Sequence, residues 1–196
     1  MRSTAFLIRS SLVLAFVSAG AAASAQTAPA PAPAPAPPTP GNGPLSAAMR
    51  DQYNAVKLNV TEAAAKMAEA DYGFRPVDTV RTFGAFVGHI ADGNLSYCAL
   101  AKGDKPAMAD SEKLTTKAEL VAALATAVAY CDEVYGAMTD EKALALVKAG
   151  RTDMPAAALL FRNVSHTNEH YGNLVTYMRI KGLVPPSTER AQQQRR

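Results

Sequence analysis

The sequence predicts an all-α protein, a four-helix bundle, and three observations lead to this prediction. Four long segments place apolar residues at steps of three and four, the period of an amphipathic helix. No segment shows the strict alternation of a half-buried strand, and the connections are of moderate length. Of the 196 residues, 48% are hydrophobic and 19% charged, so one compact core can be built.

Two segments are predicted to precede the bundle. Residues 1–25 combine early arginines, a short apolar stretch and the small residues Ala23-Ser24-Ala25, which is the pattern of a cleaved signal peptide. A membrane anchor is the alternative, but the apolar stretch is short and no stop-transfer pattern follows. Residues 26–44 form an Ala-Pro-rich linker that should stay extended and solvated. We therefore expect an exported protein, periplasmic or secreted, without a membrane span after signal cleavage.

The predicted bundle spans residues 45–184, and residues 185–196 read as a polar C-terminal tail. The first helix is expected over residues 45–67, where the apolar residues make one continuous stripe. The second helix is expected to start near Thr82 and to break around residues 102–106.

The remaining helices have clear boundary signals. The third opens with a capping box, in which Thr116 is followed three residues later by Glu119. A shorter helical segment is expected from about 141 to 148. The fourth helix is expected to begin at Pro155 and to end at Gly182, because proline suits a first turn and glycine a helix end.

The three histidines of the chain all fall on these predicted helices. His166 and His170 are four residues apart on the fourth helix and project from one face, and His89 lies on the second. Helix axes about 8–10 Å apart would let the three imidazoles converge, with Gly88 and Gly93 leaving room beside them. Three imidazole nitrogens with an open position are typical of a catalytic metal, here zinc, nickel, iron or manganese. The alternative is that the histidines only satisfy hydrogen bonds in the core.

Several other side chains qualify as part of such a site. Glu169 is expected either at the surface or behind the ligands, in contact with them and not with the metal, and Asp92 is either solvated or an orienting or fourth ligand. Asn163 and Asn173 flank the histidine pair on its own face, so we expect them to hydrogen-bond to the ligands. Three tyrosines either line the cavity or pack in the core: Tyr53, Tyr97 and Tyr177.

The two cysteines, Cys98 and Cys131, fall on the second and third predicted helices. In an oxidising compartment they are expected to form a disulfide across the bundle. Two buried free thiols are the alternative. Their spacing matches neither a metal-binding nor a redox motif.

The composition excludes some functions and leaves two open. No basic stripe interleaved with aromatic residues is present, which argues against nucleic-acid binding, and no nucleophile elbow or phosphate-binding glycine loop occurs. The leading hypothesis is a metal-dependent hydrolase or transferase acting on an unknown small-molecule substrate. The alternative is a non-catalytic binding or envelope-stress module with a structural metal.

Two segments, RTFGAFVGHIADGNLSYCAL and HTNEHYGNLVTYMRIKGLVPPS, resemble the DinB-like (DinB/YfiT) family of four-helix bundles. The resemblance covers about residues 45–187 and rests on one histidine in the second helix and H-x-x-x-H in the fourth. It implies that His89, His166 and His170 bind a divalent metal. It also implies frequent homodimers and, for some relatives, thiol-dependent transferase or isomerase activity. A signal peptide is a departure from relatives that use a cytoplasmic thiol.

Overall fold

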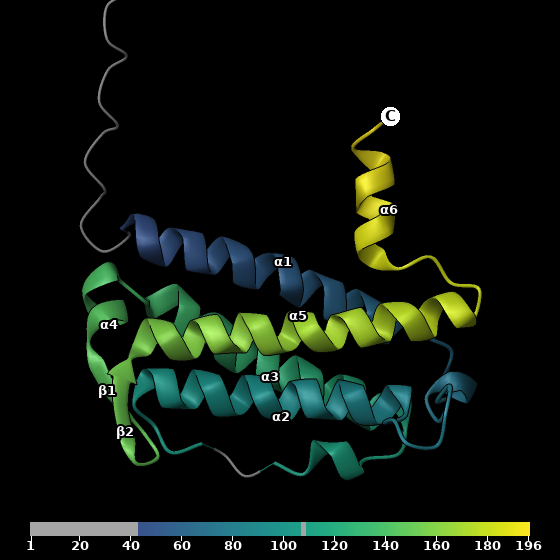
Figure 1. The fold of residues 1–196 in the computed structure, drawn as a ribbon, viewed down its shortest axis with the longest axis horizontal. Helices are drawn as coiled ribbons and strands as arrows, with labels where there is room; N and C mark the ends of the chain where they lie inside the picture. Colours follow the sequence, from purple (N-terminus) through teal and green to yellow (C-terminus); the bar gives the residue numbers. More distant parts are fainter. Residues whose placement is uncertain (1–42, 107–108) are drawn as a thin grey trace, which may run out of the picture. The chain divides into compact units, whose positions relative to one another are not determined.

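The structure, a computed structural model, describes residues 43–106 and 109–196. These residues form six α-helices, two 3-10 turns and one two-stranded hairpin (Figure 1). The elements are α1 (Pro44–Lys66), η1 (Glu69–Asp71), α2 (Phe83–Lys102), η2 (Ser111–Lys113), α3 (Lys117–Ala137), α4 (Asp140–Leu144), β1 (Leu146–Ala149), β2 (Thr152–Pro155), α5 (Ala156–Ile180) and α6 (Pro186–Gln193). The expected signal peptide and nearly all of the expected linker lie outside the described residues.

The prediction of a mostly helical fold is confirmed. Each of the four segments expected to be a long helix is helical, as α1, α2, α3 and α5. Helix α2 packs against both α3 and α5, and α1 packs against the same two helices. Each long helix therefore buries its apolar stripe against two neighbours.

Local signals set the helix starts as expected. The Thr116 side chain accepts a hydrogen bond from the Glu119 backbone N–H, and the Glu119 carboxylate reaches back to the Thr116 N–H, so the capping box is complete. Thr82 caps α2 by accepting from the Ala85 N–H at 3.1 Å. These caps satisfy backbone donors that the first helical turn leaves unpaired.

The connection between α4 and α5 corrects the expectation of a helical segment over 141–148. Helix α4 ends at Leu144, and residues 146–155 form an antiparallel hairpin instead. Gly150 takes a φ of 65° at the first position of the two-residue turn, which residues with a side chain rarely adopt. The Lys148 and Asp153 side chains pair across the strands at 3.1 Å. The turn requirement thus outweighs the short helical pattern.

The C-terminal residues differ from the expected polar tail, because α6 docks on α1. Arg190 donates to Glu62 and Asn59, and the Tyr171 hydroxyl donates to the Ser187 hydroxyl at 2.8 Å. Pro186 is buried at the start of α6. The two contacts of Arg190 join residues 128 and 131 positions apart, so local composition did not reveal them.

Helix α3 is long and apolar enough, by length and composition alone, to cross a membrane. In this fold its stripe of Leu120, Leu124 and Ala127 is buried inside the protein. Helix α3 also carries Cys131, which is bonded to α2.

Candidate metal centre

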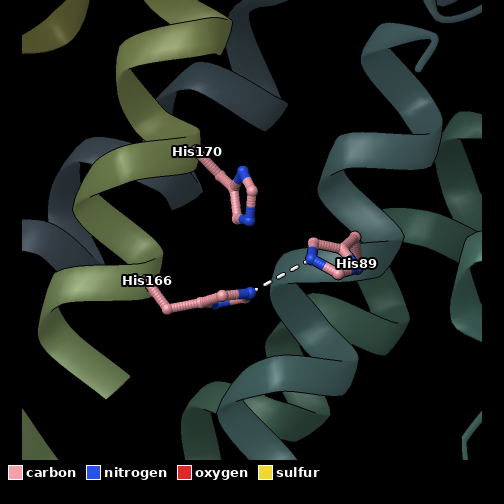
Figure 2. Close-up of side chains that lie close together, drawn as sticks. All are labelled: His89, His166 and His170. Carbon is pink, nitrogen blue, oxygen red and sulfur yellow. Dashed lines mark hydrogen bonds between the residues drawn. The ribbon is translucent and has the colours of Figure 1, made fainter. Parts of the chain in front are cut away.

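Helices α2 and α5 bring the three histidines together, as the sequence predicts. His166 and His170 lie one turn apart on α5 and point across to His89 on α2 (Figure 2). One ring nitrogen from each histidine lies within 4.8 Å of the other two. The Nε2 atoms of His89 and His166 are 3.1 Å apart.

A glycine and two aromatic rings shape the space around the cluster. A Cβ placed on Gly93 would lie 2.4 Å from Cε1 of His166, so the missing side chain makes room for that ring. The Phe86 ring lies 5.4 Å from the His170 ring, and the Tyr97 ring lies 5.6 Å from that of His166. The imidazoles therefore stand between apolar ring surfaces and are all partly buried.

This environment favours neutral imidazoles. Burial is the main cause that lowers the pKa of His166 to about 4, and the neighbouring His170 and His89 lower it further. Burial also lowers the pKa of His170, followed by the charge of His89. Because only a neutral imidazole has a lone pair for a metal, both residues are in the ligand-competent state near pH 7.

The Nδ1 atoms of the three histidines differ in their hydrogen-bonding surroundings. The Nδ1 of His89 lies 3.4 Å from a carboxylate oxygen of Glu112, and the Nδ1 of His170 lies 3.4 Å from the amide nitrogen of Asn173. The Nδ1 of His166 is buried without a hydrogen-bond partner. The expected contact of Asn173 with the histidine pair is thus present.

The expectation for Asn163 is wrong, and two of the tyrosines do not reach the cluster. Asn163 is fully buried, but its amide donates to the Tyr135 hydroxyl at 3.3 Å and towards a disulfide sulfur. The Tyr53 ring stacks on Tyr135 at 4.0 Å. Tyr177 packs edge to face on Phe86 at 5.7 Å. A helical wheel places Asn163 on the right face but cannot show which neighbour lies opposite.

Among the acidic residues, sequence reasoning missed the one that faces a histidine. The Asp92 carboxylate accepts the Ser111 backbone N–H at 3.2 Å and is not one of the clustered groups. Glu169 is exposed, as expected. Glu112 lies in η2, between two long helices, where no periodic pattern pointed to it. Its role depends on how that connection folds back on α2.

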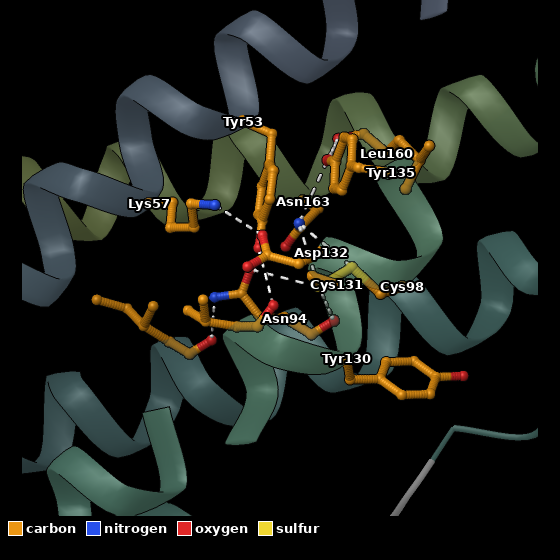
Figure 3. The surroundings of a disulfide bond; sticks show 12 residues. Tyr53, Lys57, Asn94, Cys98, Tyr130, Cys131, Asp132, Tyr135, Leu160 and Asn163 are labelled. Atoms are coloured by element: carbon orange, nitrogen blue, oxygen red, sulfur yellow. Dashed lines mark hydrogen bonds and ion pairs between the residues drawn. A yellow bond between two sulfur atoms is a disulfide. The ribbon is translucent and has the colours of Figure 1, made fainter. Parts of the chain in front are cut away.

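Cys98 and Cys131 form a disulfide between α2 and α3 (Figure 3). Both residues are fully buried, and their Cα atoms are 5.5 Å apart. That separation is the usual one for a disulfide. The predicted pairing is therefore present in the structure.

A separate pocket of about 500 Å³ lies near the hairpin and contains none of the histidines. It is lined by Ala101, Lys102, Glu133, Val134, Ala137, Met138, Lys142, Ala145 and Val147. Its walls are mostly apolar and offer one carboxylate, Glu133, but no histidine or thiol, so they lack the converging donors of a transition-metal site. The donor chemistry therefore favours the histidine cluster over this pocket as the metal centre.

Comparison with protein families identifies the chain. The family model of the DinB superfamily matches residues 52–174, which includes all three histidines. The chain belongs to the DinB superfamily. None of the curated proteins is similar enough in sequence to match this DinB-like chain.

Solved structures share the fold of this DinB-like protein. A DinB-like protein from Bacillus subtilis is 20% identical, with a TM-score of 0.57, over 69% of this chain and 92% of that one. A DinB-like protein from Bacillus cereus ATCC 10987 is 14% identical, with a TM-score of 0.60, over 70% and 93%. A mycothiol-dependent maleylpyruvate isomerase is 13% identical, with a TM-score of 0.56, over 67% of this chain and 61% of that one. At these identities the likeness concerns the fold alone.

Proposed function

We propose that this protein is an exported four-helix bundle that binds one divalent metal ion through His89, His166 and His170, and that the metal centre is catalytic. The observation that carries the proposal is the convergence of one nitrogen from each imidazole within 4.8 Å of the others. The reaction we favour is hydrolysis or group transfer on a small molecule.

The donor set fits a divalent transition metal. The 3.1 Å separation of two Nε2 atoms means that two lone pairs face one another unless a proton or a cation lies between them. Imidazole ligands suit zinc, nickel and iron, and manganese is also compatible with a mixed nitrogen and oxygen shell. Within the residues that the structure describes, no carboxylate or thiol joins the three histidines in the group. Three protein ligands are the number typical of a catalytic site.

The protein's own groups have distinct tasks at such a centre. A divalent ion held there supplies a Lewis acid that lowers the pKa of a water or thiol nucleophile. The three imidazoles hold the ion from two helices, so its position depends on the packing of α2 against α5. The Phe86 and Tyr97 rings limit the access of water beside the histidines. The Arg81 guanidinium, 5.9 Å from the Phe86 ring, adds a positive charge at the edge of the site.

Export favours water over a thiol as the nucleophile. The pattern of residues 1–25 and the disulfide between Cys98 and Cys131 both fit an oxidising compartment, where reduced thiols are scarce. The fold is shared with a mycothiol-dependent isomerase, which keeps thiol-dependent transfer as the second reaction class. N-terminal sequencing of protein from the culture fluid and periplasm tests export. A mature chain that starts at Gln26 is expected, and an uncleaved chain that starts at Met1 would contradict it.

Metal analysis of the mature protein, purified without a histidine tag, tests the centre. We expect about one equivalent of metal in the parent and in Asn168→Ala, an exposed control on the same helix, and loss of metal in His166→Ala. A parent that no divalent ion can load would end the proposal.

Thermal unfolding with and without metal then separates the catalytic from the structural alternative. A catalytic centre leaves the metal-free protein folded, and adding metal at 100 times its dissociation constant stabilises it by about 2.7 kcal/mol. A metal-free protein that is unfolded would favour a structural metal.

A further inference from the structure

The segment before α3 folds back onto the face of α2 that carries His89. Two residues of α2 near His89, Gly88 and Asp92, hold this segment in place. A Cβ on Gly88 would lie 2.4 Å from the Ser111 carbonyl oxygen, so only glycine permits this approach. The Asp92 carboxylate accepts the Ser111 N–H at 3.2 Å. Together these contacts set the register of η2 along α2.

This register places the next residue, Glu112, beside the histidine. Its carboxylate oxygen Oε1 lies 3.4 Å from Nδ1 of His89. The same oxygen accepts from Nε of Arg81 at 2.5 Å, which orients the carboxylate from the other side. The His89 and Glu112 side chains are 28% and 33% exposed, so water only partly screens their interaction.

We propose that Glu112 is a positioning residue that holds His89 with its proton on Nδ1 and turns the Nε2 lone pair towards His166 and His170. A carboxylate has only acceptors, so it favours a donor on the nitrogen that faces it. In a neutral imidazole the opposite nitrogen is then bare. Only the use of that lone pair by a metal rests on the proposed function, because the position of the proton does not require a metal.

The contacts of His166 support the same proton position. With the proton of His89 on Nδ1, its Nε2 accepts from Nε2–H of His166 across 3.1 Å. The reverse arrangement would place a proton on Nδ1 of His166, where it would be buried without an acceptor. It would also point a bare Nδ1 of His89 at the Glu112 carboxylate. With the proton of His89 on Nδ1, only Nδ1 of His166 lacks a partner. The reverse arrangement leaves an unpaired donor on His166 and a repulsive contact between His89 and Glu112.

Carboxylates that contact the second nitrogen of a ligand histidine commonly affect metal affinity by about 10–100-fold. Glu169 offers a matched comparison, because it adjoins His170 in sequence but is exposed and makes no contact with the His89 ring. Removing its charge changes the local field without removing the contact that Glu112 makes.

The first experiment uses nitrogen-15 NMR on the metal-free mature protein near pH 7.5. Only three histidines are present, so each ring can be assigned from His→Gln variants. We expect the proton of His89 on Nδ1 in the parent and in Glu169→Gln, and a mixture of tautomers in Glu112→Gln. A proton on Nε2 in the parent, or an unchanged His89 in Glu112→Gln, would overturn the proposal. A helical circular dichroism spectrum equal to that of the parent checks the fold of each variant.

The second experiment measures Co²⁺ and Zn²⁺ affinity by competition with a chelator. We expect Glu112→Gln to weaken binding about 10–100-fold, and Glu169→Gln to stay within about twofold, since an exposed charge is screened. Glu112→Asp keeps the charge but withdraws the carboxylate by one methylene group, so it should fall between the parent and Glu112→Gln. Equal affinity for the parent and Glu112→Gln would contradict the positioning role. A parent that binds neither ion would refute the proposed function, while the NMR result would still decide the role of Glu112.

Discussion

Helices α2 and α5 each contribute to two regions of opposite character. One is the disulfide core, made by Cys98, Cys131 and the residues packed on them, and the other is the histidine cluster of His89, His166 and His170. On α2, Cys98 is fully buried, whereas the side chain of His89 is 28% exposed. On α5, Asn163 is fully buried, and one turn later His166 is only partly buried. Each region keeps an unpaired polar atom, because Oδ1 of Asn163 and Nδ1 of His166 are both buried without a hydrogen-bond partner, although the Asn163 amide nitrogen donates to a tyrosine hydroxyl.

The histidine cluster is thus less completely buried than the disulfide core, although α2 and α5 contribute to both. Around the disulfide, Tyr53 of α1 and Tyr135 of α3 stack at 4.0 Å beside the fully buried cysteines. Beside the histidines, Gly93 has no side chain, and the His166 ring occupies the space that a side chain would fill. The cluster therefore keeps three imidazole nitrogens facing each other, an arrangement that a stability-optimised core would avoid.

The largest effect is expected from opening the disulfide core. Replacing both cysteines, as Cys98→Ala with Cys131→Ala, frees a loop of 33 residues. The chain-entropy model gives a loss of about 3–4 kcal/mol in the free energy of unfolding. Urea denaturation of the parent and the double variant measures it. Thiol titration of the unreduced, denatured parent is the companion test, and two reactive thiols would contradict the disulfide.

The disulfide variant also shows whether the two regions are independent. Its metal affinity should stay close to that of the parent, because no histidine contacts a cysteine among the contacts that the structure describes. Loss of metal in a variant that still folds would mean that the disulfide supports the centre.

The next effect falls on the histidine cluster alone. Gly93→Ala places a methyl group where the His166 ring lies, so metal affinity should fall about 10–100-fold, or about 1.4–2.8 kcal/mol. Helix propensity favours alanine, which should offset part of the clash in the stability of the metal-free protein. Isothermal titration with Zn²⁺ measures the affinity.

Gly172→Ala is the matched control for this substitution. Gly172 lies on α5 near His170, and a Cβ there would meet no atom within 4 Å. This variant should gain about 0.5–1 kcal/mol of stability and bind metal as the parent does. If both alanine variants bind metal equally well, the space beside His166 is not needed for the centre.

A smaller effect is expected from acidification of the metal-free protein. The pKa of His166 falls to about 4 in the folded state, mainly through burial, from about 6.5 in the unfolded chain. Between these values the unfolded state binds more protons, so stability is complete above pH 6.5 and declines as the pH falls towards 4. Partial exposure limits the loss to about 1–2 kcal/mol.

Urea midpoints from pH 7.5 to 4 measure this loss, and His166→Gln should show a shallower decline. Carboxylates with lowered pKa values, such as Asp140 of α4, which accepts from the Ser46 N–H at the start of α1, lose their contribution to stability at lower pH than His166 does. A stability that stays constant from pH 7.5 to 4 would show that His166 is not buried as a neutral ring.

The smallest effect concerns the edge of the disulfide core. Lys57 pairs with Asp132 at 2.7 Å, and these side chains are 22% and 45% exposed. Lys57→Met keeps most of the aliphatic stem over Tyr53 and removes the charge, so stability should change by less than about 1 kcal/mol. Thermal unfolding at low and high salt measures it. A change of several kcal/mol would mean that the ion pair, rather than buried packing, stabilises this region.

The sequence alone determined the helices, their main caps and the positions of the candidate ligands along them. Periodicity and the signal at Thr116 depend on residues only a few positions apart, and the spacing of His166 and His170 puts them on one face. That His89 meets them was an expectation from helix packing, and the family resemblance supported it.

Tertiary structure decided which side chains surround those ligands. The Glu112 carboxylate reaches His89 only because η2 folds back on α2, and Asn163 turns to Tyr135 because α3 lies opposite it. The hairpin and α6 likewise depend on a turn geometry and on contacts with the distant α1. Helix periodicity records which face of a segment is apolar, whereas the partner of each polar atom depends on residues that are distant in the chain and meet only after folding.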